Sequence, residues 1–465
     1  MASNLPTTRR NVSADDISNL KQLLKATTAT FLTPNDADYP KSIQRWSQAA
    51  EKPAGAVVLP TTSEDVAVAL RYATEHNLDV AVKGGGHSSA GTSSTAGGLL
   101  FDLGRMRNVR VDTGSKLVVV GGGCVWDDVD SAMQPHGLAT VGGTVGDTGV
   151  GGLTLGGGYG WLSSKHGLVI DNLVSATVVL ASGEIKTASK TENEDLFWAL
   201  CGAGQNFAIA TEFVLRAHDQ DDVWAGMLLY PPTPAHIKGV VAAANNLYGF
   251  RDTADGKKTN KSDGRCGSAI VLGLPPQAGG QVMLIVVVVF NGKEEEGKQA
   301  YQEFFDIGPV VNTVQTMPYA NVNKLFSVPY GMRASMKGTG IRAPIRPEFV
   351  QEIAENFTTF TANEADFAGS MVFWELVDPT RIVEQTTGSF ANRGYHFNGL
   401  VMPMWSKPEH DQKGRQWARD VAALFKDELK RQGGETGTSG ALLQYGNYDV
   451  STRSHSETIV RRLTI

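Results

Sequence analysis

The stretch AVKGGGHSSAG, residues 81–91, places three consecutive glycines between Lys83 and His87. It closes a predicted β-α-β unit over residues 54–84, in which a capped helix separates two short apolar strands. Glycine has no Cβ, so a run of three lets the backbone approach another chemical group closely. A histidine directly after such a run therefore predicts a binding loop.

Glycine clusters recur after this stretch. The chain contains 52 glycines among 465 residues, and residues 84–160 hold the segments GGGH, AGG, VGGGC, VGGTVG, GVGG and LGGGYG. Apolar residues alternate between the clusters, so this region is predicted to be folded and not a low-complexity linker. One such cluster is usually a tight turn, but several in one region favour a site that the backbone approaches closely.

Three known kinds of phosphate-binding site would use such glycines. A P-loop requires GxxxxGK followed by Ser or Thr, and no segment of the chain has that pattern. A Rossmann site requires GxGxxG between a strand and a helix, and the clusters of residues 84–160 do not fit that spacing. The third kind uses backbone N–H groups of several glycine-rich loops as anion-binding nests, and it matches the sequence.

Composition disfavours several classes of protein. A formal net charge of −6 without a basic block disfavours nucleic acid as a partner. The longest apolar run, VMLIVVVVF at residues 282–290, is far shorter than a membrane span and predicts a buried strand. The N-terminus has no signal-peptide pattern, and three widely spaced cysteines offer no metal-binding spacing. We therefore expect a cytoplasmic protein that uses no nucleic acid, membrane or metal; secretion without a recognisable signal stays open.

The pattern of the sequence changes near residue 219. Before it, glycine-rich loops separate short strands and helices. After it, longer apolar strands alternate with amphipathic helices, such as those expected at residues 346–357 and 408–432. The second half is therefore predicted to be an antiparallel sheet backed by helices.

Three segments and a C-terminal motif together resemble one protein family. They are KGGGHSSAG (83–91), the glycine-rich segment at 137–172, DLFWALCGAGQNFAIAT (195–211) and YGNY (445–448). In order and spacing they are similar to the vanillyl-alcohol-oxidase/PCMH superfamily of FAD-linked oxidases, and most of all to its berberine-bridge-enzyme-like branch. The resemblance implies an α+β fold, with a PCMH-type FAD-binding domain of two α/β subdomains and a substrate domain.

The resemblance also implies a division of the chain. Residues 1–218 would form the FAD-binding domain, 219–427 the substrate domain, and 428–465 a segment that returns to the FAD domain. Family members usually continue after the YGNY motif with a helix and a Tyr-Asp-Pro segment. Here residues 461–465 read RRLTI, so we expect the last helix to pack differently.

In this family the histidine after the glycines is joined covalently to the flavin, which assigns that role to His87. Imidazole nitrogen is nucleophilic near neutral pH, so the chemistry suits the residue. Other members carry a second link through a cysteine, whose place is taken here by Val145, and we therefore expect a single link. The place of the plant-type histidine is Leu153, and Thr148 occupies a position that influences oxygen access. The remaining residues expected to contact FAD are Lys83, Gly84, Gly85, Gly86, Ser88, Gly91, Thr144, Gly149, Gly151, Gly152, Gly156, Gly157, Gly158, Gly160, Trp161, Asn206, Ile209 and Asn447.

The catalytic residues are less clearly implied. Many family members carry a carboxylate on a substrate-domain strand, and its place here is Asn398, which cannot act as a base. Glu375, on another strand, is an alternative carboxylate or a structurally paired residue. Tyr445 is the best candidate for the base, or it only stacks and donates a hydrogen bond; a phenol would need a lowered pKa or concerted proton transfer. His396 is a weaker site candidate.

These features predict an FAD-dependent oxidoreductase, with an oxidase as the first expectation. A small organic substrate, such as an alcohol, sugar, alkaloid or polyketide, would lose a hydride to the flavin, and molecular oxygen would reoxidise it to give hydrogen peroxide. Two alternatives stay open: a dehydrogenase of the same fold, and a flavin-holding cyclase or scaffold without redox turnover. The sequence fixes no oligomeric state.

Overall fold

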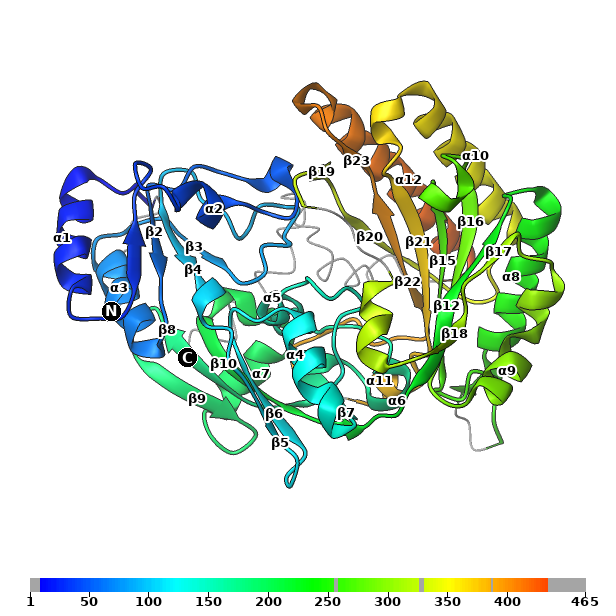
Figure 1. The fold of residues 1–465 in the computed structure, drawn as a ribbon, viewed down its shortest axis with the longest axis horizontal. Coiled ribbons are helices and arrows are strands. Elements are labelled where there is room, and N and C mark those ends of the chain that lie inside the picture. The colour runs from blue at the N-terminus through cyan, green and yellow to red at the C-terminus, as the bar shows by residue number, and fades with distance from the viewer. Residues whose placement is uncertain (1–8, 255–257, 326–329, 386–387, 434–465) are drawn as a thin grey trace.

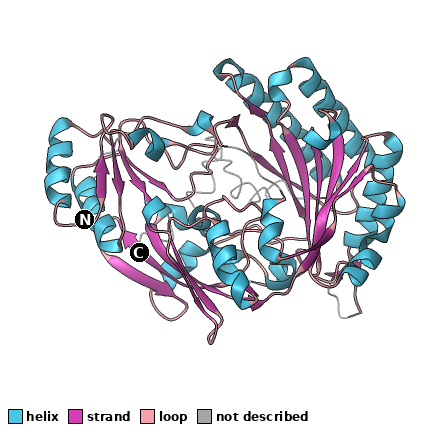
Figure 2. Ribbon diagram, in the orientation of Figure 1, coloured by secondary structure: helices cyan, strands magenta, loops and turns pink. Residues whose placement is uncertain are grey.

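The computed structural model describes residues 9–254, 258–325, 330–385 and 388–433. These residues form two lobes joined face to face, and the glycine-rich loops lie between them (Figure 1). The first lobe contains two sheets, and the second contains one large sheet with helices on its outer face (Figure 2). The α+β architecture expected from the sequence is confirmed.

The N-terminal subdomain of the first lobe has a four-stranded sheet in the order β1-β2-β4-β3. Its elements are α1 (Ala14–Leu24), β1 (Thr30–Leu32), α2 (Tyr39–Ile43), β2 (Ala56–Leu59), α3 (Ser63–Glu75), β3 (Val80–Lys83) and β4 (Leu99–Asp102). Both helices begin with a capping box: Ser13 caps α1 and Thr62 caps α3. The β-α-β unit is present, but β4 lies between β2 and β3 and is parallel to both.

The second subdomain has a five-stranded antiparallel sheet in the order β5-β6-β10-β8-β9. Its elements are β5 (Val109–Asp112), β6 (Leu117–Gly121), α4 (Trp126–Met133), α5 (Val150–Leu155), α6 (Ser163–His166), β8 (Leu173–Leu180), β9 (Ile185–Ser189), α7 (Glu194–Ala203) and β10 (Ala208–Arg216). A short ladder pairs β7 (Leu138–Ala139) with β11 (His218–Asp219), where the chain leaves this lobe. A tight turn joins β8 and β9, where Gly183 has a φ of +79°.

The second lobe is built on an eight-stranded antiparallel sheet in the order β17-β12-β16-β15-β21-β22-β20, with β18 also paired to β12. Its strands are β12 (Val223–Tyr230), β15 (Cys266–Gly273), β16 (Met283–Phe290), β17 (Val311–Asn312), β18 (Gln315–Met317), β20 (Lys337–Ile341), β21 (Met371–Val377) and β22 (Phe397–Met402). Its helices are α8 (Pro234–Tyr248), α9 (Glu294–Asp306), α10 (Pro347–Asn363), α11 (Thr380–Glu384) and α12 (Asp411–Arg431). Short ladders pair β13 (Arg251–Asp252) with β14 (Lys258–Thr259), and β19 (Arg333–Ala334) with β23 (Met404–Trp405).

The two faces of the large sheet have different neighbours. Helices α8, α9, α10 and α12 cover the outer face (Figure 1), and the inner face turns toward the first lobe. The chain passes from the first lobe to the second between β11 and β12. Helix α12 continues to Arg431 and belongs to the second lobe, so residues 428–431 lie in that lobe's helix. None of the helices among the described residues is long and apolar enough to span a membrane.

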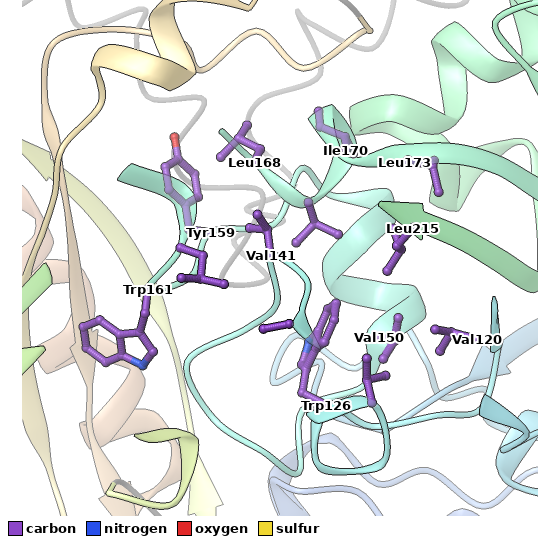
Figure 3. Packing of buried hydrophobic residues seen from close by; sticks show 14 of the residues in the cluster. Val120, Trp126, Val141, Val150, Tyr159, Trp161, Leu168, Ile170, Leu173 and Leu215 are labelled. Atoms are coloured by element: carbon purple, nitrogen blue, oxygen red, sulfur yellow. The ribbon is translucent and has the colours of Figure 1, made fainter. Parts of the chain in front are cut away.

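One apolar core joins the two lobes. Trp126, Val141 and Val150 pack at its centre, and Tyr159 and Trp161 lie at the edge that faces the large sheet (Figure 3). Side chains from the inner face of that sheet, among them those of Val271 and Val287, belong to the same core.

The turn at 390–393 fastens the lobes together at a second place. The ring of Phe390 packs so closely on Gly157 that a Cβ there would lie 2.6 Å from it. The guanidinium of Arg393 donates to both carboxylate oxygens of Asp171, at 2.7 and 3.1 Å. This buried, bidentate ion pair and the ring contact hold the turn against the first lobe.

Two imidazoles stack where the chain passes between the lobes. The rings of His166 and His218 lie 3.6 Å apart at an interplanar angle of 10°, and Nε2 of His218 is 2.8 Å from Oδ1 of Asn172. Burial lowers the pKa of His166 to about 3, and the neighbouring His218 and Lys165 act in the same direction. Burial also lowers the pKa of His218. Both rings are therefore neutral at pH 7.

We predict that this pair makes the protein acid-labile. Below about pH 6.5, the ordinary pKa of histidine, these two imidazoles bind protons in the unfolded chain but not in the folded one. The free energy of unfolding therefore falls as the pH drops toward 3. Replacing His166 by Phe keeps an aromatic ring and removes the titrating group. The fall in thermal midpoint between pH 7.5 and pH 5 should shrink in His166→Phe and stay as in the parent in His136→Phe, an exposed control. An unchanged fall in His166→Phe would contradict the prediction.

Candidate active site

A cavity of about 580 Å³ lies between the glycine-rich loops of the first lobe and the inner face of the large sheet. Both subdomains of the first lobe contribute to its wall, through the loop after β3, the loop before α5 and the start of β10. The described residues along its wall are Trp46, Val80, Ala81, Val82, Gly84, Gly85, Gly86, His87, Ser88, Thr92, Ser93, Leu103, Gly122, Gly143, Thr144, Val145, Thr148, Gly149, Gly151, Gly152, Leu153, Leu155, Tyr159, Gly160, Trp161, Gln205, Asn206, Ala208, Ile209, Ala210, Ala269, Met336, Phe373, Glu375, Val377, Leu400 and Met402.

Two glycines of this wall meet backbone to backbone. A Cβ built on Gly85 would lie 2.4 Å from the backbone nitrogen of Gly149, and a Cβ on Gly149 would lie 2.4 Å from that of Gly85. Neither distance is compatible with a side chain, because both obstacles are backbone atoms. The two subdomains therefore meet here through bare main chain, and the loops bring backbone amides to the cavity.

The loop at 142–149 is fixed from behind by Trp126. The indole fills the space that Cβ atoms on Gly142 and Gly143 would need, and the Trp126 backbone N–H donates to the carbonyl oxygen of Thr148 at 3.1 Å. Thr148 and Val145 lie in the cavity wall as a result.

None of the three cysteines of the chain, all of them among the described residues, lies in the cavity wall. Cys124, Cys201 and Cys266 are each buried, and burial raises the pKa of each thiol to about 12. They are poor nucleophiles.

His87 lies in the wall with three neighbours from distant parts of the chain. The Trp46 ring is nearly parallel to the imidazole, at 15° and 5.6 Å between centroids. The Tyr330 hydroxyl is 3.3 Å from Nε2 of His87, and an Asp147 carboxylate oxygen is 3.6 Å from the same atom. The imidazole is thus held on one face and at one edge.

The sheet side of the cavity is mostly apolar and carries one carboxylate. Phe373, Glu375 and Val377 alternate along β21 with residues that face the outer helices, and Leu400 and Met402 of β22 extend the same surface. Glu375 is the only acidic residue among the described residues of the cavity wall.

Asn398 stands directly opposite Glu375 in the antiparallel pairing of β21 and β22. Paired residues in such a ladder point to the same face, with Cβ atoms about 5 Å apart. The place expected to carry a carboxylate is therefore occupied by a buried amide, and a carboxylate is present one strand away on the same face. The sequence analysis named Glu375 and Asn398 as separate candidates, but it did not predict that they lie opposite each other on neighbouring strands.

Most residues expected to contact a flavin lie in the cavity wall. Those that do are Gly84, Gly85, Gly86, His87, Ser88, Thr144, Val145, Thr148, Gly149, Gly151, Gly152, Leu153, Gly160, Trp161, Asn206 and Ile209. Those that lie outside it are Lys83, Gly91, Gly156, Gly157 and Gly158. Tyr445 and Asn447 fall outside the described residues, and their roles stay predictions.

Three of the positions outside the wall, Lys83, Gly157 and Gly158, have structural explanations. The Lys83 ammonium is partly buried and donates to the Asp102 carboxylate and the Ser42 carbonyl oxygen, each at 3.1 Å. Gly157 and Gly158 have positive φ and leave room for the side chains of Phe390 and Val169. These glycines serve the turn after α5 and the contact between lobes.

Three large aromatic residues near the candidate positions belong to the outer core of the second lobe. Trp374, Phe397 and Trp405 are almost fully buried under the helices, so they are core residues. His396 does not line the cavity, and burial lowers its pKa to about 4. A neutral imidazole there is a structural feature of the second lobe.

Trp46, Gln205 and Tyr159 are among the wall residues that the sequence analysis missed. Trp46 is far from the glycine clusters along the chain, and no local pattern indicates its contact with His87. Gln205 donates to the carbonyl oxygen of Gly152 at 3.0 Å and so supports α5. Tyr159, within LGGGYGW, stood beside residues that were chosen; its hydroxyl donates to the Asn392 carbonyl at 3.2 Å, and burial raises its pKa.

The cavity has features that fit a dinucleotide cofactor such as FAD. It combines bare glycine backbone with an apolar surface, and the indole Nε1 of Trp161 is buried without a hydrogen-bond partner among the described residues. Backbone amides of glycine loops suit a pyrophosphate, and apolar walls suit a flat ring system.

Comparison with known proteins agrees with this interpretation. Residues 54–189 match the family described as FAD binding domain. The FAD-linked oxidoreductase pgmH of Aspergillus terreus is 36% identical over 296 residues, which are 64% of this chain and 58% of that protein. An FAD-linked oxidoreductase of Dictyostelium discoideum is 29% identical over 372 residues, 78% of this chain and 76% of that protein. The chain thus spans under two thirds of the length of the first of these relatives.

Solved structures share the fold across nearly the whole chain. 6-Hydroxy-D-nicotine oxidase of Arthrobacter nicotinovorans superposes with a TM-score of 0.76 at 23% identity, covering 92% of this chain and 91% of the other. Glucooligosaccharide oxidase of Acremonium strictum, which carries a 6-S-cysteinyl, 8α-N1-histidyl FAD, gives 0.72 at 20% identity and covers 88% of each chain.

The fold, the cavity and the family match together show that this chain contains an FAD-binding domain. In sequence the chain is similar to FAD-linked oxidoreductases, and it shares its fold with 6-hydroxy-D-nicotine oxidase and a berberine-bridge-enzyme-like protein of Physcomitrella patens. The recognition made from the glycine motifs is confirmed.

We predict that Gly149→Ala destabilises the protein. Gly149 has an ordinary backbone conformation, with a φ of −65°, so the cost comes from the methyl group pressing on the backbone of Gly85. We expect the free energy of unfolding to fall by about 1–3 kcal/mol, the usual cost of overpacking, and FAD retention to fall with it. Gly369→Ala is the control, because the nearest atom to its added methyl would be Cβ of Met404 at 3.5 Å. Equal thermal midpoints in both variants would contradict the role assigned to Gly149.

Proposed function

We propose that this protein is an FAD-linked oxidase, in which a small organic substrate loses a hydride to flavin that is held covalently by His87, and molecular oxygen accepts the electrons. The observation that carries the proposal is the cavity itself: backbone loops with His87 form one wall, and an apolar sheet face with a single described carboxylate forms the other. This arrangement places a cofactor cradle and a substrate-sized surface opposite each other.

The residues of this chain divide the work. The loops at 84–88 and 144–152 would hold FAD through backbone amides, and His87 would tether it. FAD, when bound, supplies the hydride acceptor. The large sheet would place the substrate on the open side and exclude water from it.

The sheet surface favours a particular kind of substrate. Phe373, Leu400 and Met402, with Met336 nearby, offer little hydrogen bonding. The hydroxyls of a sugar would be left unpaired against this surface, at a considerable cost in free energy. We therefore expect a substrate with a largely apolar skeleton, such as an alkaloid or polyketide, with one polar group near Glu375.

The proton that leaves with the hydride needs an acceptor. Glu375 lies in the cavity wall and faces the same side of the sheet as Asn398, so it can replace the carboxylate that the expected place lacks. Asn398 would then act as a hydrogen-bond donor or acceptor toward the substrate. Tyr445 is the rival candidate from outside the described residues.

Oxygen as the acceptor rests on Thr148. It takes the position that influences oxygen access in the family, and its side chain is close in size to valine, which is frequent there. A dehydrogenase of the same fold is the second candidate function.

A panel of apolar alcohols, amines and phenols tests the proposal: substrates should bleach the flavin anaerobically, and air should restore the colour with formation of peroxide. Slow reoxidation in air would favour the dehydrogenase, and no bleaching by any compound would favour a scaffold.

We predict that His87→Ala abolishes acid-stable flavin. The parent protein should keep its yellow colour in the pellet after acid precipitation, because a covalent bond survives unfolding. The variant should release FAD into the supernatant but still bind it when folded, since the glycine cradle is unchanged. A variant that keeps covalent flavin would show that another residue makes the bond.

We predict that Glu375→Gln lowers kcat by about 100-fold, the usual contribution of a general base, with a smaller change in KM. Glutamine keeps the size and the hydrogen-bonding capacity of the side chain but cannot take a proton. Tyr445→Phe is the matched comparison. If Tyr445→Phe shows the larger loss of kcat and Glu375→Gln is near the parent, the tyrosine is the base.

A further inference from the structure

We propose that Tyr330 and Asp147 are positioning residues for the attachment of the flavin: they fix the proton of His87 on Nε2 and leave Nδ1 as the nucleophile. This inference rests on the proposed covalent link at His87. Both residues approach His87 from other segments of the chain, Asp147 from the loop before α5 and Tyr330 from the second lobe.

The hydrogen bonds of Tyr330 determine which nitrogen of His87 carries the proton. Its hydroxyl lies 3.1 Å from the carbonyl oxygen of Gly85 and 3.3 Å from Nε2 of His87. A carbonyl oxygen only accepts, so the single phenol proton goes to Gly85. The same hydroxyl oxygen must then accept from His87, and this requires a proton on Nε2.

The phenol remains a donor over the working pH range. Burial raises the pKa of Tyr330 to about 12, and the nearby charge of Asp147 acts in the same direction. A neutral phenol keeps its proton for Gly85. The tautomer of His87 is therefore set by geometry at the loop that carries it.

Asp147 adds charge where it is needed. Its carboxylate oxygen is 3.6 Å from Nε2, on the side of the ring that carries the proton. When Nδ1 forms a bond to carbon, the ring becomes positively charged until the Nε2 proton leaves, and a carboxylate at this distance favours that charge. The pair works as a carboxylate does behind a catalytic histidine, where it fixes the tautomer and stabilises the imidazolium.

The remaining neighbours of His87 fix the orientation of its imidazole and leave Nδ1 without a hydrogen bond to any described residue. No described residue hydrogen-bonds Nδ1 of His87, and the side chain lines the cavity. Trp46 lies nearly parallel to the imidazole and its backbone N–H donates to the carbonyl oxygen of Gly86 at 3.1 Å. Ring and loop are thus fixed together, which lowers the entropy cost of reaching the bond-forming geometry.

The attachment balances with oxygen as oxidant. The Nδ1–carbon bond to the 8α position replaces one C–H bond of the methyl group, and the imidazole loses the proton of Nε2. The two electrons and two protons go to the isoalloxazine and from there to molecular oxygen. One hydrogen peroxide therefore forms for each covalent bond, so bond formation has a readout that does not depend on substrate turnover.

The test follows covalent incorporation after FAD is added to flavin-free full-length protein from riboflavin-starved cells. Tyr330→Phe and Asp147→Asn should each slow the appearance of acid-stable flavin, and the matching release of peroxide, by about tenfold or more. The dissociation constant for FAD before attachment should change less than about threefold, since the cradle is intact. Asp147→Glu should recover much of the rate lost in Asp147→Asn, because it restores the charge.

Two control variants make the same types of substitution, Tyr to Phe and Asp to Asn, at positions away from His87. Tyr72→Phe removes a phenol that bonds Asp16 in the first lobe, and Asp263→Asn removes a surface carboxylate of the second lobe. Both should attach flavin at the parent rate.

The outcomes separate this inference from the proposed function. Parent rates in Tyr330→Phe and Asp147→Asn would overturn the positioning role and leave the His87 link standing. Equal losses of FAD binding and of attachment would also overturn it, because the residues would then only build the site. Absence of acid-stable flavin in the parent, or its persistence in His87→Ala, would overturn the proposed link itself.

Discussion

The contact between the backbones of Gly85 and Gly149 is the constraint on which the rest of the site depends. Gly85 follows β3 of the first sheet, and Gly149 precedes α5 of the second subdomain. A side chain on either residue would separate the two subdomains, because backbone atoms occupy the place of its Cβ. The cavity lies along this seam, and His87 follows two residues after Gly85. The positions of His87, of the glycine loops and of the boundary between the subdomains therefore depend on one another.

Glycine patterns predicted this part of the molecule well because their physical requirement is local. A position that tolerates no Cβ must be glycine, and the cluster can be recognised without knowing what it touches. Neighbours that converge from distant segments leave no such trace. Trp46, Tyr159 and Tyr330 are ordinary aromatic residues in the sequence, and only the fold brings them to the cavity and to His87. Lys83 is the reverse case. Its place beside the glycines predicted a contact with a ligand, but its ammonium instead forms an ion pair with a buried aspartate on the neighbouring strand.

The carboxylate in the cavity wall shows a related limit of sequence analysis. Comparison with the family along the sequence finds Asn398 at the place of the expected carboxylate and therefore indicates that the carboxylate is absent. Such a comparison considers one strand at a time and cannot detect a residue on the neighbouring strand. The register of β21 against β22 sets Glu375 opposite that residue, on the face that lines the cavity. Sheet pairing is a long-range property, and a charged group can change strands while keeping its place over the cavity. The amide that remains at Asn398 stays buried beside it.

The apolar core that spans both lobes gives the division into two domains a limited meaning. Trp126 and Val150 from one lobe and Val271 and Val287 from the other share that core, and Arg393 and Asp171 add a buried ion pair across the same boundary. Each lobe, taken alone, would expose a large apolar surface to water and would leave one member of the ion pair, Arg393 or Asp171, without its partner. The gene can be divided near residue 219, but the folded enzyme cannot, and recombination with a relative would have to exchange both sides of the boundary together.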